Sequence, residues 1–188
     1  MTQLNDIEIK EVVKERYGNL AREASAGEVS AACCSTDCGC SEAELDVLLP
    51  LYTDTETEGL PIEAIAASAG CGNPTALASL SPGETVVDFG SGGGIDCFLA
   101  AREVGESGRV IGIDMTQDMV NLANSNAKKL GLSNAEFRLA EIDNTTLDDD
   151  TADIIISNCV INLAPDKDSV FQEAFRILKP GGRMMISD

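Results

Sequence analysis

Seven cysteines and a complete absence of histidine define the chemistry open to this 188-residue sequence. Without histidine there is no Ser-His-Asp triad, no Cys-His dyad, no histidine general base and no histidine-containing metal site. Cysteine thiolates are soft ligands for soft metals and metalloids, and each thiol must first lose a proton near a pKa of about 8.5. The candidate reactive groups are therefore the cysteine thiols, at positions Cys33, Cys34, Cys38, Cys40, Cys71, Cys97 and Cys159.

The spacing of these cysteines does not favour a structural zinc site. Such a site needs two cysteine pairs at roughly C-x2–4-C spacing, and the cluster over residues 33–40 does not supply both. Cys97 lies inside an expected helix, and we predict that it is a small buried apolar residue. Cys159 follows the end of an expected strand, where it is either another small buried side chain or a thiol that takes part in the chemistry.

A glycine-rich turn joins the first expected strand to the helix after it. The run Gly90-Ser91-Gly92-Gly93-Gly94 stands where an open α/β sheet binds its ligand, and glycine lets backbone approach that ligand closely. A dinucleotide fingerprint would need glycine where the chain has Ile95. Asp88 precedes the loop, and Asp114 ends the second strand, where a carboxylate can accept both ribose hydroxyls of an adenosine. The pattern favours an adenosine-containing ligand; the alternative is a tight turn with Asp114 as a helix cap.

Alternating strands and helices are expected to carry these residues. Short apolar runs predict the strands, and amphipathic periodicity predicts the helices between them. The expected strands are 85–89, 109–114, 135–139, 154–157 and 183–187; the expected helices are 95–104, 117–130 and 166–178, with a turn over 179–182 before the last strand. This alternation predicts an α/β fold with a parallel, doubly wound, Rossmann-like sheet over residues 81–188.

Residues 1–80 are expected to form a helical, cysteine-bearing N-terminal segment. Apolar residues at every third or fourth position predict an amphipathic helix over residues 7–24. Capping and proline signals predict further helices over 41–49, 61–69 and 73–80, and residues 28–40 are expected to form a loop.

Three stretches of the chain resemble the arsenite S-adenosylmethyltransferases, which are class I S-adenosylmethionine-dependent methyltransferases. They are residues 88–97, residues 113–116 and, most distinctively, residues 157–167, which read Ser-Asn-Cys-Val-Ile-Asn-Leu-Ala-Pro-Asp-Lys. Residues 70–75 and Tyr17-Gly18 are similar to further segments of that family. The resemblance implies a sheet of seven strands, of which five are recognised here, so we expect the chain to be truncated at its C-terminus.

The resemblance also implies S-adenosylmethionine as cofactor and a set of residues that bind it. Loop glycines line the methionine moiety with Asp88 nearby, and Asp114 binds the ribose. Met115 packs on the adenine, although plain core packing is the alternative for this side chain. Asn158 approaches the methionine amino group through its backbone. The implied set is Asp88, Gly90, Gly92, Gly94, Asp114, Met115, Asn158 and, flanking the adenine edge, Glu141 and Ile142.

For the substrate, the resemblance implies trivalent arsenic held by cysteine thiolates. The arsenic lone pair attacks the sulfonium methyl group in line, and this reaction depends on positioning rather than on a general base. Cys159 corresponds to a direct As(III) ligand, and Cys71 to a mobile third thiol that acts as ligand or as disulfide partner. Either Cys33 or Cys34 corresponds to the N-terminal cysteine of the family. Arsenite and a thiol reductant of glutathione or thioredoxin type are the implied partners.

Two other functions fit parts of the pattern. A small-molecule C- or O-methyltransferase like those of quinone biosynthesis would share the glycine loop and Asp114 but would not need Cys71 and Cys159 together. A non-catalytic, thiol-rich metalloid-binding domain would keep the fold without the turnover.

The overall charge excludes other classes of partner. Thirteen Lys and Arg against thirty-two Asp and Glu give a net charge of −19, which disfavours nucleic acid and anionic membrane surfaces. The sequence opens without an apolar secretory segment and has no apolar stretch near the roughly 20 residues that span a bilayer. We therefore expect a cytoplasmic protein whose thiols are kept reduced.

Overall fold

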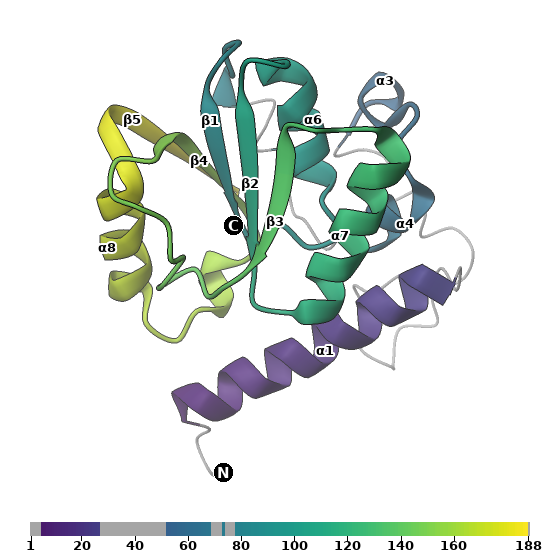
Figure 1. Ribbon diagram of the computed structural model, residues 1–188. Helices are drawn as coiled ribbons and strands as arrows, with labels where there is room; N and C mark the ends of the chain where they lie inside the picture. Colours follow the sequence, from purple (N-terminus) through teal and green to yellow (C-terminus); the bar gives the residue numbers. More distant parts are fainter. Residues whose placement is uncertain (1–4, 27–51, 69–72, 74–77, 188) are drawn as a thin grey trace.

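Five parallel strands form the centre of the molecule. The structure, a computed structural model, describes residues 5–26, 52–68, 73 and 78–187 (Figure 1). The strands are β1 Thr85–Phe89, β2 Arg109–Asp114, β3 Ala135–Leu139, β4 Ala152–Asn158 and β5 Leu178–Ser187, in the order β3-β2-β1-β4-β5. Every neighbouring pair is parallel, which confirms the expected α/β fold with a Rossmann-like sheet.

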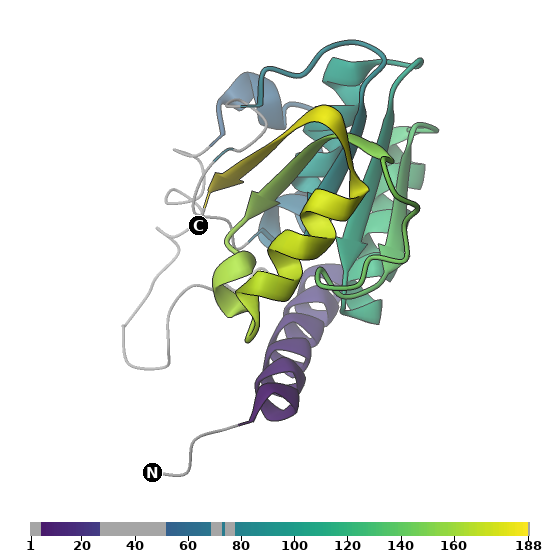
Figure 2. The same ribbon diagram turned by 90° about the vertical axis from the view of Figure 1, so that its left-hand side faces the viewer.

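Helices cover both faces of this sheet, so its central strands are apolar on both sides. In β4, for example, the three consecutive isoleucines 154–156 are fully buried. Helices α6 Ile95–Val104 and α7 Gln117–Leu130 lie on one face, and α8 Lys167–Ile177 lies on the other (Figures 1 and 2). The chain runs outward from β1 to β3 and then returns to build β4 and β5 on the other side of β1. The carboxyl ends of β1 and β4 therefore flank the point where open sheets bind ligands.

The N-terminal helix, α1 Asp6–Ala26, packs on the helical layer at this carboxyl edge. It buries Leu20, Ala21 and Ala24 in one cluster with Met119 and Leu122 of α7. Figure 1 shows α1 crossing beneath the ends of the strands. The short helices are α3 Asp54–Thr57, α4 Ile62–Ala66 and the 3-10 turn η2 Ile161–Leu163. None of the helices in the described ranges is both long and apolar enough to cross a membrane.

One expected boundary is wrong. The sequence predicted a turn over 179–182 before the last strand, but β5 already begins at Leu178, which pairs with Ala152 of β4. The register then shifts so that Arg183 pairs with Ile154, and Gly181 takes a left-handed conformation with φ +84°. The extra residues form a bulge because pairing with β4 holds the chain on both sides of them.

The other expected elements lie at or near their predicted positions. Strands β1 to β3 and helices α6 and α7 match residue for residue, and α1, α4, β4 and α8 differ by a few residues at their ends. The helix expected over 41–49 and most of the one expected over 73–80 lie outside the described residues.

Candidate functional site

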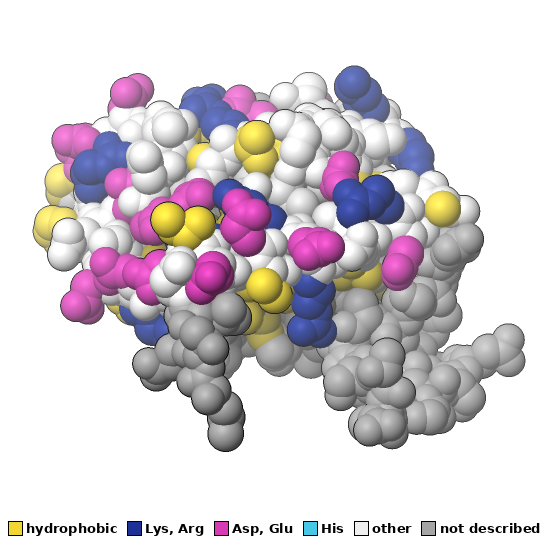
Figure 3. All heavy atoms as spheres, turned by 90° about the horizontal axis from the view of Figure 1, so that it is seen from below, with side chains coloured by type: hydrophobic (Ala, Val, Ile, Leu, Met, Phe, Trp, Pro, Cys, Tyr) yellow, Lys and Arg dark blue, Asp and Glu magenta, His cyan; other side chains and the backbone are white. Residues whose placement is uncertain are grey.

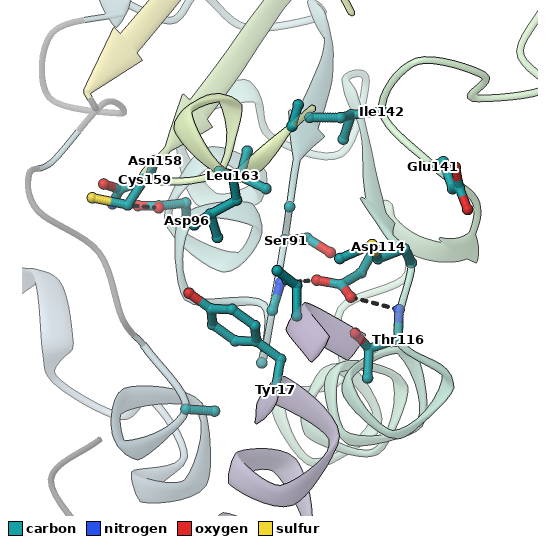
Figure 4. A pocket seen from close by; sticks show the side chains of 18 of the residues that line it. Tyr17, Ser91, Asp96, Asp114, Thr116, Glu141, Ile142, Asn158, Cys159 and Leu163 are labelled. Atoms are coloured by element: carbon teal, nitrogen blue, oxygen red, sulfur yellow. Dashed lines mark hydrogen bonds between the residues drawn. The ribbon is translucent and has the colours of Figure 1, made fainter. Parts of the chain in front are cut away.

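A pocket opens at the carboxyl ends of β1, β2 and β4, between the glycine loop, α1 and η2 (Figure 4). It brings together side chains that are more than 140 residues apart in the sequence. Among the predicted cofactor-binding residues, those that line it are Gly90, Gly92, Asp114, Met115, Glu141, Ile142 and Asn158. Gly94 and Asp88 are not part of the lining, although they belong to the same strand-loop-helix unit.

Both the backbone conformation and close neighbours require glycine in the loop. Gly90 has φ +76°, and a Cβ there would lie 2.6 Å from Cγ2 of Val160. Gly94 caps the start of α6 with φ +97°, and a Cβ there would lie 2.6 Å from the Phe98 ring. A larger residue at either position would displace the loop, so the close approach of backbone to the pocket depends on these two glycines.

Asp114 ends β2 with its carboxylate on the pocket wall. Its Oδ2 accepts the N–H of Gly92 at 3.0 Å, and its Oδ1 accepts the N–H of Thr116 at 2.8 Å (Figure 4). Burial raises the pKa of Asp114, and the two backbone donors oppose that rise. Each carboxylate oxygen keeps a further lone pair, so the fixed group can still accept two vicinal hydroxyls of a ribose.

A second buried carboxylate, that of Asp96, reaches the pocket from the first turn of α6. Its Oδ1 accepts the Tyr52 hydroxyl at 3.0 Å, and its Oδ2 accepts Nδ2 of Asn158 at 3.2 Å. Figure 4 shows the Asp96 and Asn158 side chains pointing toward each other. Burial raises the pKa of Asp96 to about 6, against the opposing effect of the hydrogen bonds from Asn158 and Tyr52. The carboxylate is therefore mainly ionised at neutral pH.

Cys159 lies on the pocket wall directly after β4. Its φ of +57° is uncommon for a residue with a side chain, and its N–H donates to the carbonyl oxygen of Ser187 at 2.7 Å. The Cys159 sulfur is disulfide-bonded. The predicted site residues Cys33, Cys34 and Cys71 lie outside the part of the chain that the structure describes. Among the described residues, there is no group of three or more Cys, Asp or Glu side chains that could hold a metal ion.

Cys97 and Asp88 form a buried pair behind the glycine loop. The Cys97 thiol is fully buried and donates to Oδ2 of Asp88 at 3.2 Å. Burial raises the pKa of both groups, and for the thiol the nearby Asp88 raises it further. Cys97 is thus a protonated core side chain, which confirms the prediction that it is a small buried residue.

Helix α1 supplies a wall of the pocket that the sequence did not reveal. Lys10, Val13 and Tyr17 line it, and Figure 4 shows Tyr17 pointing inward. The Lys10 ammonium forms an ion pair with Asp143 at 2.8 Å and another with Glu141. The apolar periodicity of residues 7–24 predicted a helix, but it did not indicate which part of the fold this helix would contact.

Carboxylates outnumber cations around the pocket. Its described lining holds Asp96, Asp114, Glu141 and Asp143 against Lys10. Figure 3 views the molecule from the α1 side and shows acidic side chains spread over this face with basic ones between them. Such a site suits a neutral or cationic ligand better than one that carries phosphates.

A family model described as a methyltransferase domain matches residues 80–188, which include the whole sheet and the glycine loop. The chain belongs to the methyltransferase-domain family. Within this family, the expected resemblance to arsenite methyltransferases is confirmed. The arsenite methyltransferase of Halobacterium salinarum is 43% identical to this methyltransferase chain over 189 residues, which cover 96% of the chain and 47% of the relative.

Two further comparisons bear on the acceptor. The crystal structure of an arsenic(III) S-adenosylmethionine methyltransferase from Chlamydomonas reinhardtii superposes with a TM-score of 0.65 at 41% identity, covering 71% of this chain and 47% of that one. A ubiquinone/menaquinone biosynthesis C-methyltransferase of Vibrio vulnificus is 37% identical over 107 residues, or 56% of this chain and 41% of the relative. The methyltransferase chain spans about half the length of the curated arsenite methyltransferases it matches.

Proposed function

We propose that this protein transfers a methyl group from S-adenosylmethionine to trivalent arsenic held by cysteine thiolates. The observation that carries the proposal is the position of Cys159 on the wall of the pocket that also contains Asp114 and the glycine loop. A cysteine, which reduction converts to a thiol, and a carboxylate that can accept ribose hydroxyls thus share one cavity. The similarity to arsenite methyltransferases over nearly the whole chain supports the same substrate.

The residues of the pocket fit this cofactor. The two oxygens of Asp114, already oriented by Gly92 and Thr116, are available to the ribose hydroxyls. The excess of carboxylates suits a ligand that carries a sulfonium and an ammonium group. When bound, the cofactor supplies an electrophilic methyl group on a positively charged sulfur.

The chain's own part in the reaction is to hold and orient the arsenic. The Cys159 thiolate serves as one ligand, and Cys71 with Cys33 or Cys34 supplies further thiolates. The lone pair on arsenic forms the new As–C bond while the C–S bond breaks, and the electron pair of the C–S bond goes to sulfur. This step formally oxidises As(III) to As(V), and two of the cysteine thiolates return two electrons to the arsenic by forming a disulfide. A protein without histidine can do this because no proton has to be removed from the acceptor.

The proposed physiological setting is arsenic detoxification in the cytoplasm. Thiols stay reduced there, and a reductant of glutathione or thioredoxin type would return the cysteines to the thiol form after turnover. Arsenous acid is uncharged near neutral pH, so the acidic surface does not repel it.

A test uses the full-length protein with As(III), isotopically labelled S-adenosylmethionine and either glutathione or a thioredoxin system. We expect labelled methylarsenicals when the arsenic species are separated. A parallel reaction replaces arsenite with a demethylated quinol, because the match to a quinone-biosynthesis enzyme makes this the second candidate acceptor. A labelled quinol without methylarsenicals would favour the second function, and binding of both ligands without transfer to either would leave a metalloid-binding domain.

A further inference from the structure

Tyr52 lies outside the predicted site but is hydrogen-bonded into it. The side chain is 3% exposed and belongs to the same apolar cluster as Phe98 and Ile156. Its hydroxyl donates to Oδ1 of Asp96 at 3.0 Å and accepts Nδ2 of Asn158 at 3.3 Å. Since Asn158 also donates to Asp96, the three side chains form a closed ring of hydrogen bonds.

This ring fixes the residue that precedes the pocket cysteine. Asn158 is the last residue of β4, and Cys159 follows it with a left-handed φ of +57°. Such a conformation is strained for a residue with a side chain, and it persists where neighbours hold it on both sides. The hydrogen bond of the Cys159 N–H to Ser187 holds the peptide between the two residues. The Asn158 side chain, clamped by Asp96 and Tyr52, holds the residue before it.

We propose that Tyr52 is a positioning residue that, through Asp96 and Asn158, sets the place of the Cys159 thiol relative to the cofactor site. This inference rests on the proposed transfer of a methyl group to thiolate-bound arsenic. Tyr52 is not part of the pocket lining; it acts by holding the ionised Asp96 carboxylate and the Asn158 amide in place. Displacing a reacting group by about 1 Å can cost on the order of 100-fold in rate, so a lost clamp should affect turnover more than binding.

The surroundings of Asp96 predict how the clamp depends on pH. Glu56 of α3 lies near Asp96, and Tyr52 and Asn158 donate hydrogen bonds to it. The charge of Asp96 in turn raises the pKa of Asp88 on β1 and of Cys97 on α6. The pKa of Asp96 is about 6, so methyl transfer should fall below that pH as the carboxylate is protonated. Removing the Tyr52 hydroxyl takes away a donor to the ionised form. The acid limb of the pH profile should then move to higher pH.

The test compares Tyr52→Phe with the wild-type full-length protein. We expect kcat for arsenite methylation to fall about tenfold, with the Kd for S-adenosylhomocysteine unchanged within about twofold. The acid limb of kcat should shift upward in this variant and vanish in Asp96→Asn, whose amide does not titrate. We also expect the reduced Tyr52→Phe variant to react faster with iodoacetamide. Alkylation of Cys159, measured by peptide mass spectrometry, should be about threefold faster than in the reduced wild type, because the thiol is held less firmly.

Thr145→Val is the matched control because it also removes a buried hydroxyl that donates to a carboxylate, that of Glu173 on α8. This variant should leave kcat, the pH profile and the alkylation rate at their wild-type values. Wild-type kcat in Tyr52→Phe, or an equal loss of kcat and of S-adenosylhomocysteine affinity, would overturn the inference. If the wild-type protein makes no methylarsenical, the proposed function fails, while the alkylation rates still decide whether Tyr52 positions Cys159.

Discussion

At the scale of single residues, the two described cysteines have opposite environments. Cys97 is fully buried, donates to a buried carboxylate and has a raised pKa, so it stays a thiol. Cys159 stands on the wall of the pocket at the end of a strand. The difference follows from their positions: Cys97 faces the core from α6, and Cys159 follows the edge of the sheet at which ligands bind.

This contrast predicts different effects of two conservative changes. Cys159→Ser replaces a soft ligand by a hydroxyl, so arsenite methylation should fall by about 100-fold or more, with S-adenosylhomocysteine affinity unchanged within about twofold. Cys97→Ala, as the matched control, should keep turnover and lower the free energy of unfolding by about 1 to 2 kcal/mol. Steady-state kinetics, calorimetry and urea denaturation measure the three quantities. Loss of cofactor affinity in Cys159→Ser would instead assign the cysteine a structural role.

At the scale of elements, the sequence predicted the sheet well because its signals are local. An apolar run such as Val86-Val87 indicates a strand, and the glycine after α7 indicates the end of a helix. Both signals can be recognised without reference to the rest of the chain. The bulge at the start of β5 was not predicted, because Pro180 and Gly181 favour a turn locally. Only the pairing with β4 overrides that preference. The candidate cofactor-binding residues were predicted in the same local way, from short motifs.

The residues that the sequence missed share a different property. Tyr52 and Asp96 matter through contacts with side chains at least 44 residues away, and Lys10 meets Glu141 across 131 residues. No spacing rule connects positions on separate elements, because their meeting depends on the way in which helices pack on the finished sheet. The interactions of α1 with the pocket therefore needed the structure.

The contacts of α1 predict that this helix slows release of the cofactor. Lys10 and Lys14 both pair with Glu141, whose pKa is lowered chiefly by the hydrogen bond from Lys10. Replacing both lysines by alanine should speed dissociation of S-adenosylhomocysteine about two- to fivefold, the range expected for partly exposed ion pairs. Stopped-flow fluorescence with a labelled ligand measures the rate.

The control for this prediction removes an equivalent pair of cations elsewhere. Arg109 and Arg138 both pair with Glu136 on strands β2 and β3, outside the pocket lining. Their double replacement by alanine should leave the dissociation rate unchanged. Equal acceleration in both double variants would mean that overall charge, rather than the position of α1, governs release.

At the scale of the whole molecule, a net charge of −19 coexists with three buried carboxylates near one pocket. Asp88, Asp96 and Asp114 all have raised pKa values, with burial as the largest cause. Self-repulsion of a highly charged chain also destabilises the compact state. Both effects act in the same direction, since adding protons relieves each of them. The acidic pocket is thus maintained at a cost in stability that a positively charged ligand would offset.

This arrangement predicts that the protein becomes more stable as the pH falls from 7.5 to about 5.5. A carboxyl group with a raised pKa binds more protons in the folded than in the unfolded state. The stability that it contributes is therefore lost as the pH rises through its pKa in the folded protein, which is about 6 for Asp96. Surface acids such as Glu84, which is paired with Arg183 and has a lowered pKa, lose their contribution only in more acidic solution. The Tm should therefore rise by about 3 to 6 °C over this interval, measured by circular dichroism at constant ionic strength. In Asp96→Asn the rise in Tm should be smaller, because one of the responsible groups no longer titrates. If the Tm of the wild type stays flat or falls on acidification, the buried carboxylates do not control its stability.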